Sequence, residues 1–242
     1  MTEPPIRGCI PTCWTYDQTG MHPQIFRTGE EVDMRADAER NRAAALAAAE
    51  AVYAEQGVEV SLNEIARRAE IGNATLYRHF PTHEALLSEV YTGHLERYCA
   101  IAEDAARAAD PVAALRDCVT ATCALQATNR GLADLLASLR PLSPHVDALR
   151  VRHHRAVTTV FRRAVRTGEL CVDASPEDFA VLLIANAGLI HRTVDDAPRS
   201  SARLVAVWLA GVLPHDMVDV PPAPTETQVR RALGDPGGAR PR

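Results

Sequence analysis

The sequence contains no lysine, few aromatic residues and no apolar run long enough to cross a membrane. All 26 basic residues are arginine, which we interpret as codon bias toward GC-rich DNA and not as a functional device. Aromatic residues make up 5% of the chain and alanine is very common, a composition that favours helices over sheets. The most apolar stretch, residues 179–190, is well short of the ~20 residues that a membrane-spanning helix requires.

Signatures of catalysis and of metal binding are also missing. Six cysteines are scattered without a framework, as in proteins of a reducing cytosol, and no second pair with metal-ligand spacing follows Cys9 and Cys13. No His-Glu-x-x-His, glycine-rich phosphate loop, Gly-x-Ser-x-Gly or secretory signal occurs. We therefore expect a cytoplasmic protein that is not an enzyme and has no cofactor or metal. An enzyme or metal protein built on Cys9–Cys13 and His153–His154 is the weakest alternative.

The residues that are present predict an all-α fold. Hydrophobic residues make up 47% of the chain, enough for a core. Helical periodicity predicts helices, and no strand, at about residues 37–56, 61–69, 73–80, 83–105, 111–128, 132–139, 145–167, 176–193 and 200–213. We expect a disordered extension at 1–34, a first domain at 35–97, a second helical domain at 98–214 and a disordered Pro- and Gly-rich tail at 215–242.

Two of these helices, within residues 61–80, form a predicted helix-turn-helix. Ser61 and Glu64 match a capping box that starts the first helix. Gly72 is expected to allow the sharp turn, and Leu76 and Phe80 to bury the second helix. The second helix then carries a polar outer surface that suits the major groove of DNA, made by Asn73, Thr75, Tyr77, Arg78 and His79.

The stretch ALAAAEAVYAEQGVEVSLNEIARRAEIGNATLYRHFPTHEALL, most specifically TLYRHF, resembles the N-terminal domain of TetR-type transcriptional regulators. The resemblance covers about 60 residues, from Arg35 to Arg97, and implies a helical, dimeric second domain. It also implies base contacts from Asn73 and Thr75. It further implies phosphate contacts from Ser61, Tyr77, His79 and His83. Arg78 is added to them because the chemistry of arginine suits a phosphate.

Two positions depart from the pattern of the family. His83 stands where lysine is usual, so this phosphate contact is expected to be weaker or pH-dependent. Gly72 stands where a capping Ser or Thr is common. The charge is also mixed: residues 35–97 hold 7 Arg and 10 acidic residues, a net of −3, while residues 71–83 hold one Arg, two His and no acid. A basic patch is therefore expected locally and not over the whole domain. A plain helical hairpin is the alternative.

The last two predicted helices are apolar on nearly every side, reading FAVLLIANAGLI and LVAVWLAGVL. Such helices must be covered all round, which predicts a twofold four-helix dimer interface that holds two recognition helices about 34 Å apart. The alternative is a monomer with both helices in its core. The candidate interface residues are Phe179, Leu183, Asn186, Leu204 and Trp208.

The helix at 145–167 is divided into an arginine face and an apolar face. The arginines, at 152, 155, 162, 163 and 166, are expected to be a solvated face in preference to a second nucleic-acid site. His153 and His154 fall on the apolar side, either as hydrogen-bonded core residues or as part of a ligand pocket. The pocket candidates are Gln126, Asn129, His153, His154, Asn186 and His191.

Together these patterns and the resemblance predict a ligand-responsive regulator, and the resemblance implies that it is a repressor. Its expected partners are double-stranded DNA with a palindromic operator, a second copy of the chain and an unknown small-molecule effector, with no membrane. The alternative regulator binds DNA constitutively without an effector, and a pocket filled by side chains would favour it.

Overall fold

The computed structural model describes residues 12–17, 20–25, 29–138, 141–171, 174–193, 195–214 and 217–232. The chain divides into two compact units, Met1–Ala43 and Ala44–Arg242. Within the described residues no helix has the length and apolar character needed to span a membrane.

The first unit contains a β-hairpin and the start of the first helix. Strands β1 (Thr12–Asp17) and β2 (Gly20–Ile25) pair antiparallel, with Thr12 opposite Ile25. Helix α1 begins at Gly29. This corrects the prediction of a strandless, disordered extension up to residue 34, although the other residues of that segment before 29 lie outside the described ones. The β-branched and aromatic residues of β1 favour a strand, but six residues are too few to give a clear alternation.

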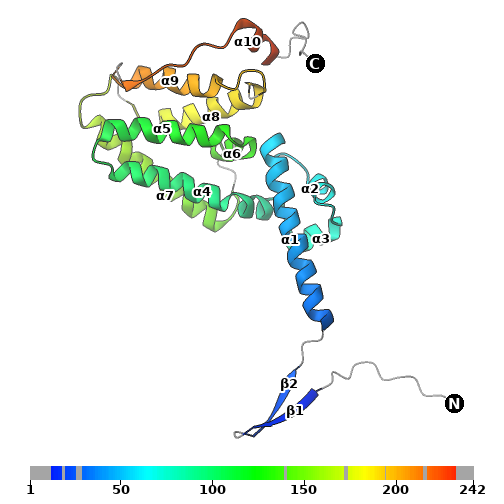
Figure 1. Cartoon of the computed structure of the whole chain (residues 1–242). Helices are drawn as coiled ribbons and strands as arrows, with labels where there is room; N and C mark the ends of the chain where they lie inside the picture. The colour runs from blue at the N-terminus through cyan, green and yellow to red at the C-terminus, as the bar shows by residue number, and fades with distance from the viewer. Residues whose placement is uncertain are drawn as a thin grey trace, which may run out of the picture. The chain divides into compact units, whose positions relative to one another are not determined.

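The all-α prediction is confirmed for the body of the chain, where the helices lie close to their expected positions (Figure 1). Side chains one residue before the helices fix several starts by accepting backbone N–H bonds, as at Ser61, Thr82, Asp110, Asn129 and Ser143. The helices are α1 (Gly29–Gln56), α2 (Leu62–Arg68), α3 (Asn73–His79), α4 (His83–Arg107), α5 (Pro111–Ala127), α6 (Arg130–Leu136), α7 (Pro144–Val165), α8 (Pro176–Thr193) and α9 (Ser200–Val212).

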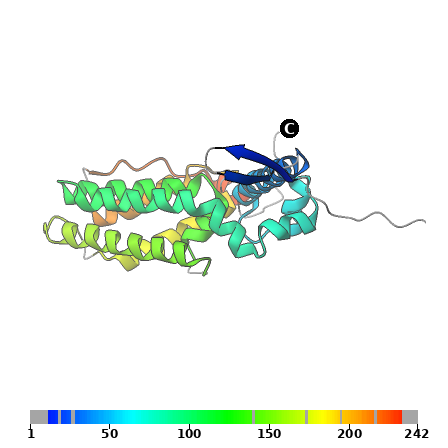
Figure 2. The ribbon, with the colours of Figure 1, turned by 90° about the horizontal axis from the view of Figure 1, so that it is seen from below.

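Two large apolar clusters, with a small third one of Ala133, Ala187 and Ile190, form the core of the described part of the second unit. The first joins α1, α2 and α3 to the start of α4 and also takes in residues of α6 and α7, with Tyr53, Ile65 and Leu86 fully buried. The second joins the end of α4 to α5, α7, α8 and α9. Helices α4, α5 and α7 run side by side (Figures 1 and 2). Because α4 contributes to both clusters, it connects the helix-turn-helix directly to the larger helical layer.

The C-terminal segment is ordered over residues 217–232, which corrects the prediction of a disordered tail there. Met217 and Val218 pack against the second cluster, and helix α10 spans Glu226–Ala232. Thr225 and Gln228 form a capping box, with Thr225 Oγ1 accepting from Gln228 N at 3.3 Å and Gln228 Oε1 accepting from Thr225 N at 2.8 Å. This spacing is present in the sequence and could have revealed the helix. Residues 215–216 and 233–242 lie outside the described ones.

Candidate nucleic-acid interface and internal cavity

The predicted helix-turn-helix is present, but its turn differs from the expectation. Ser61 Oγ accepts from Glu64 N at 3.3 Å, whereas the Glu64 carboxylate pairs with Arg67 and not with the Ser61 backbone, so only half of the capping box forms. The left-handed residue of the turn is Glu70, with φ of 55°. Gly72 is extended, with φ of −68° and ψ of 142°, and its expected role in allowing the sharp turn is corrected.

Replacing Glu70 by glycine is therefore expected to stabilise the fold. A side chain in the left-handed region costs about 1–2 kcal/mol, part of which glycine loses again through its greater freedom when unfolded. We expect a gain of about 0.5–1 kcal/mol, or about 1–4 °C in the thermal midpoint of a domain of this size. Glu70→Ala removes the same side-chain contacts but keeps the strain. An equal rise for both variants would attribute the effect to the glutamate side chain and not to the backbone.

The outer surface of α3 is polar and accessible, as predicted. Leu76 and Phe80 anchor the helix, with exposed fractions of 0% and 2%. On the other side Asn73 and Arg78 are exposed and Tyr77 is 46% exposed, while Thr75 and His79 are half-buried. A short helix held by two buried anchors and presenting amide, phenol and guanidinium groups can enter the major groove and contact base edges and phosphates.

His83 lies at the start of α4 and is half-buried. Its ring packs edge-on against Tyr53, with the ring centroids 5.6 Å apart. The position that the resemblance assigns to a phosphate contact therefore also takes part in the packing of α4 against α1.

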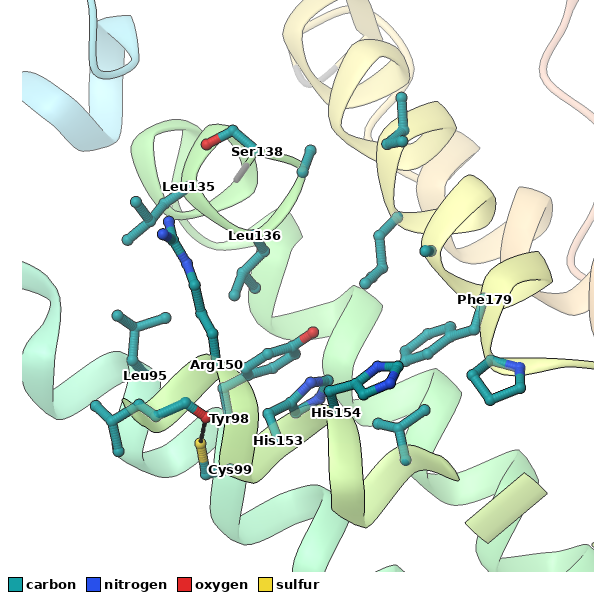
Figure 3. Close-up of a pocket in the computed structure, with 17 residues that line it drawn as sticks. Leu95, Tyr98, Cys99, Leu135, Leu136, Ser138, Arg150, His153, His154 and Phe179 are labelled. Carbon is teal, nitrogen blue, oxygen red and sulfur yellow. Dashed lines mark hydrogen bonds between the residues drawn. The ribbon is translucent and has the colours of Figure 1, made fainter. Parts of the chain in front are cut away.

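A cavity of about 280 Å³ lies between α4, α6, α7 and α8 (Figure 3). Its wall is mainly apolar, with Tyr98 and Cys99 from α4, Arg150 and His153 from α7, and Phe179 from α8. The segment 135–138 at the end of α6 closes another side. Both predicted histidines line the cavity, but they differ: His153 is 8% exposed, whereas His154 is exposed and is not on a buried face.

The His153 ring stacks on Tyr98, with centroids 3.6 Å apart and an angle of 16° between the ring planes. Burial, followed by the neighbouring His154, lowers the pKa of His153 to about 3, so the imidazole is neutral near pH 7. Among the described residues, none hydrogen-bonds to the buried Nε2 atom of His153. A buried polar atom without a partner is unfavourable, and here it lies beside an internal cavity.

The other four pocket candidates do not line this cavity, which corrects their assignment. Gln126 and Asn186 join α5 to α8, with Asn186 Nδ2 donating to Gln126 Oε1 at 2.9 Å, and Ser201 Oγ of α9 donating to Asn186 Oδ1 at 2.7 Å. Asn129 caps α6 and accepts from the Tyr91 hydroxyl at 2.9 Å. These side chains are polar and buried because they connect helices, and sequence alone does not distinguish that role from ligand binding.

His191, the fourth of these residues, belongs to a contact set that the sequence analysis missed. Its Nε2 lies 2.5 Å from Oδ1 of Asp134 on α6, and Oδ2 of Asp134 accepts from Val58 N at 3.1 Å. Arg130, also on α6, donates to Glu55 O at 2.8 Å. These contacts tie α6 to the end of α1, and we call Arg130, Gly131 and Asp134 the α6 latch. In the sequence, the signal for these contacts was an acidic residue, Asp134, within the apolar stretch GLADLL.

Three of the predicted interface residues are buried inside the single chain. Phe179, Leu183 and Asn186 are 2%, 5% and 0% exposed, so they face the protomer's own core and their assignment to a dimer contact is corrected. Leu204 and Trp208 are half-buried against the second cluster. The outer surface of α8 and α9 instead exposes other apolar side chains, namely Val181 at 64%, Ile184 at 58% and Val207 at 50%.

The arginine face of α7 is partly engaged within the chain. Arg152 binds the Glu103 carboxylate through two contacts, at 2.5 and 3.1 Å. Arg163 donates to the backbone oxygens of Ala106 and Ala108, each at 2.6 Å, and so caps the end of α4. These two arginines bind α4. The prediction that the arginine face is wholly solvated is therefore correct only in part.

Cysteine and histidine groups do not suggest another centre in the part of the chain that the structure describes. Within it, no group of three or more His, Cys, Asp or Glu could hold a metal ion. Cys99, Cys118, Cys123 and Cys171 are free. Cys9, on which the metal alternative partly rested, lies outside the described residues.

Comparison with known proteins agrees with this arrangement. The family model described as "Bacterial regulatory proteins, tetR family" matches residues 45–90. The TetR transcriptional regulator SCO0520 from Streptomyces coelicolor is 30% identical, over 72% of this chain and 98% of that chain, with a TM-score of 0.45. The regulator PfmR from Thermus thermophilus is 22% identical, over 75% and 97% of the two chains, with a TM-score of 0.50, a likeness of fold alone. No curated protein matches the chain.

The helix-turn-helix at residues 61–80 lies within the matched segment, and the sequence identity to SCO0520 extends over nearly the whole of that regulator. The chain therefore belongs to the TetR family of DNA-binding transcription regulators.

Proposed function

We propose that the protein is a dimeric repressor that binds a palindromic operator and is released by a small molecule. The observation that carries the proposal is the accessible polar surface of α3, mounted on a buried pair of anchors in a helix-turn-helix. Two copies of α3 related by a twofold axis would enter successive major grooves. Because two copies of α3 would bind the operator together, one helix of seven residues in each subunit is sufficient for operator binding.

The outer surface of α8 and α9 supports the dimer. Val181 on α8 and Val207 on α9 are half or more exposed in the single chain. The small exposed residues Ala185, Gly188 and Gly211 lie on the same two helices, where they would allow another helix pair to approach closely. A second copy of the same surface satisfies the symmetry of an isologous contact.

The cavity and the α6 latch support control by a ligand. Residues 135–138 line the cavity, and Asp134, immediately before them, holds the backbone of Val58 between α1 and α2. A ligand that displaces the end of α6 would therefore act on the helix-turn-helix through the latch. A coupling free energy of about 1–3 kcal/mol would change operator affinity about 5- to 150-fold. The open cavity favours this reading over constitutive binding.

The direct test of the proposal is footprinting of the full chain on the DNA upstream of its own gene. Protection of two half-sites about one helical turn apart is the expected result. Protection of a single half-site by a monomer, or protection without sequence preference, would contradict a dimeric operator-binding repressor.

Two substitutions on α3 are expected to separate affinity from sequence preference. Arg78→Ala removes an exposed cation, so it should weaken binding to operator and to random duplex alike and reduce the salt slope by about 1. Thr75→Ala should relax the preference at one base pair, at a cost of about 1–3 kcal/mol for that pair. Binding titrations at several salt concentrations on both duplexes provide the measurement. Identical losses from both variants on both duplexes would contradict the assigned roles.

A further inference from the structure

We infer that the cavity binds a small, mainly apolar monocarboxylic acid, with the carboxylate held by Arg150. This inference rests on the proposed function only in taking the cavity as the effector site. It adds the chemical class of the ligand, which follows from the charge, the lining and the polar atoms of the cavity.

The charge of the wall selects against cations. None of the described residues that line the cavity is Asp or Glu, whereas Arg150 supplies a guanidinium. Arg150 pairs with Asp147 one turn away at 3.3 Å, and its side chain is 19% exposed, so it is only partly in water. A carboxylate within the cavity would therefore meet the positive charge of Arg150 and no acidic side chain among the described lining residues. The planar guanidinium can bind a carboxylate through two parallel hydrogen bonds.

His153 supplies a second polar atom on the wall of the cavity. Arg150 and His153 are three residues apart on α7 and therefore share one side of the helix; both line the cavity (Figure 3). His153 is neutral, and its buried Nε2 has no partner among the described residues. In the tautomer protonated at Nε2, this nitrogen can donate to an oxygen of the ligand, which satisfies the atom without requiring a buried charge on the ring.

The rest of the lining defines the body of the ligand. Tyr98 stacks on His153, and Phe179, Leu95 and Leu183 complete an apolar wall. The volume of about 280 Å³ is just below the roughly 300–1,000 Å³ usual for ligand pockets. A compact acid with one apolar chain or ring fits these limits, and a large or polyanionic ligand does not.

The first experiment compares ligands on the unmodified full chain. Isothermal titration calorimetry is performed with 4-phenylbutyrate and with decanoate, each beside its amide and its amine. We expect saturable binding of at least one acid, at least tenfold tighter than its amide, and no saturable binding of the amine. Absence of binding by both acids, or an amide or amine that binds as tightly as its acid, would overturn the inference.

Variants then locate the carboxylate. Arg150→Gln should weaken acid binding at least tenfold and leave the amide unchanged, and His153→Phe, which keeps an aromatic ring on Tyr98, should weaken the acid at least threefold. Asp147→Asn removes the ion pair but keeps the guanidinium, so the acid should still bind. Arg155→Gln on the exposed side of α7 is the matched control. Equal acid affinity in wild type and Arg150→Gln would overturn the assignment.

The outcome can be separated from that of the proposed function by a parallel operator titration. Operator binding without acid binding refutes the ligand class and leaves the repressor proposal in place. Acid binding at Arg150 without any effect on operator binding supports the ligand class and contradicts release by that ligand.

Discussion

Gly131→Ala is expected to lower the thermal midpoint of unfolding by about 2–20 °C. A Cβ atom at this position would lie 2.2 Å from the Tyr91 hydroxyl oxygen and 3.0 Å from both Cβ and O of Tyr53. Tyr53 and Tyr91 are fully buried, so neither ring can move freely. The added methyl group must displace α6 from α1 or push Tyr91 away from Asn129.

The magnitude follows from two costs and one gain. Overpacking a core costs about 1–3 kcal/mol, and loss of the bond from the Tyr91 hydroxyl to Asn129 would add about 1–3 kcal/mol. The helix propensity of alanine returns about 1 kcal/mol. Differential scanning calorimetry of the two proteins provides the measurement.

Gly93→Ala is the matched control. Gly93 is exposed inside α4, and a Cβ there would meet no described atom within 4 Å. The same chemical change should therefore raise stability by up to about 1 kcal/mol. A similar shift of the midpoint in both variants would contradict close packing at Gly131. Because Gly131 belongs to the α6 latch, its variant should also weaken operator binding at temperatures where it remains folded.

Val181→Glu is expected to convert the proposed dimer to a monomer and to reduce operator affinity about 100-fold or more. Val181 is 64% exposed on α8, so the substitution leaves the protomer's own core unchanged. In the proposed dimer, however, the carboxylate would be buried against an apolar partner surface, which costs several kcal/mol. A monomer holds one α3, and the two half-sites are then no longer bound as a linked pair.

Val151→Glu provides the control for added charge. Val151 lies on α7 and is 50% exposed, away from the outer surface of α8 and α9. Sedimentation equilibrium and operator titrations of both variants give the result. A dimeric Val181→Glu protein with normal operator affinity would place the dimer contact on another surface.

Local chemistry allowed much of the fold to be predicted from the sequence. Helix starts depend on side chains within three residues, as at Ser61, and helix ends on backbone freedom, as at Gly57 with φ of +87°. The polar side of α3 follows from the spacing of Leu76 and Phe80. The hairpin β1–β2 was missed because strands of six residues are too short for a clear alternation, and helix α10 was missed because the capping box of Thr225 and Gln228 was not used.

The site in the second domain could be predicted only in part. His153 and His154 were assigned to the cavity, but Gln126 and Asn186 bond to each other across two helices, and Phe179 faces inward. Asp134 was not singled out, although it joins α6 to α8 and to the turn between α1 and α2. A polar residue in an apolar helix has the same sequence signature in all these roles.

The sequence by itself determined where most of the helices from α2 to α9 begin and end, that the second one of the helix-turn-helix has a polar side, and that the chain resembles a DNA-binding regulator. The tertiary structure decided which side of α8 and α9 remains exposed, which polar groups line the cavity and how α6 is latched to α1. Caps and periodicity are set by residues a few positions apart. Contacts such as Val58 with Asp134, 76 positions apart, depend on how the helices pack.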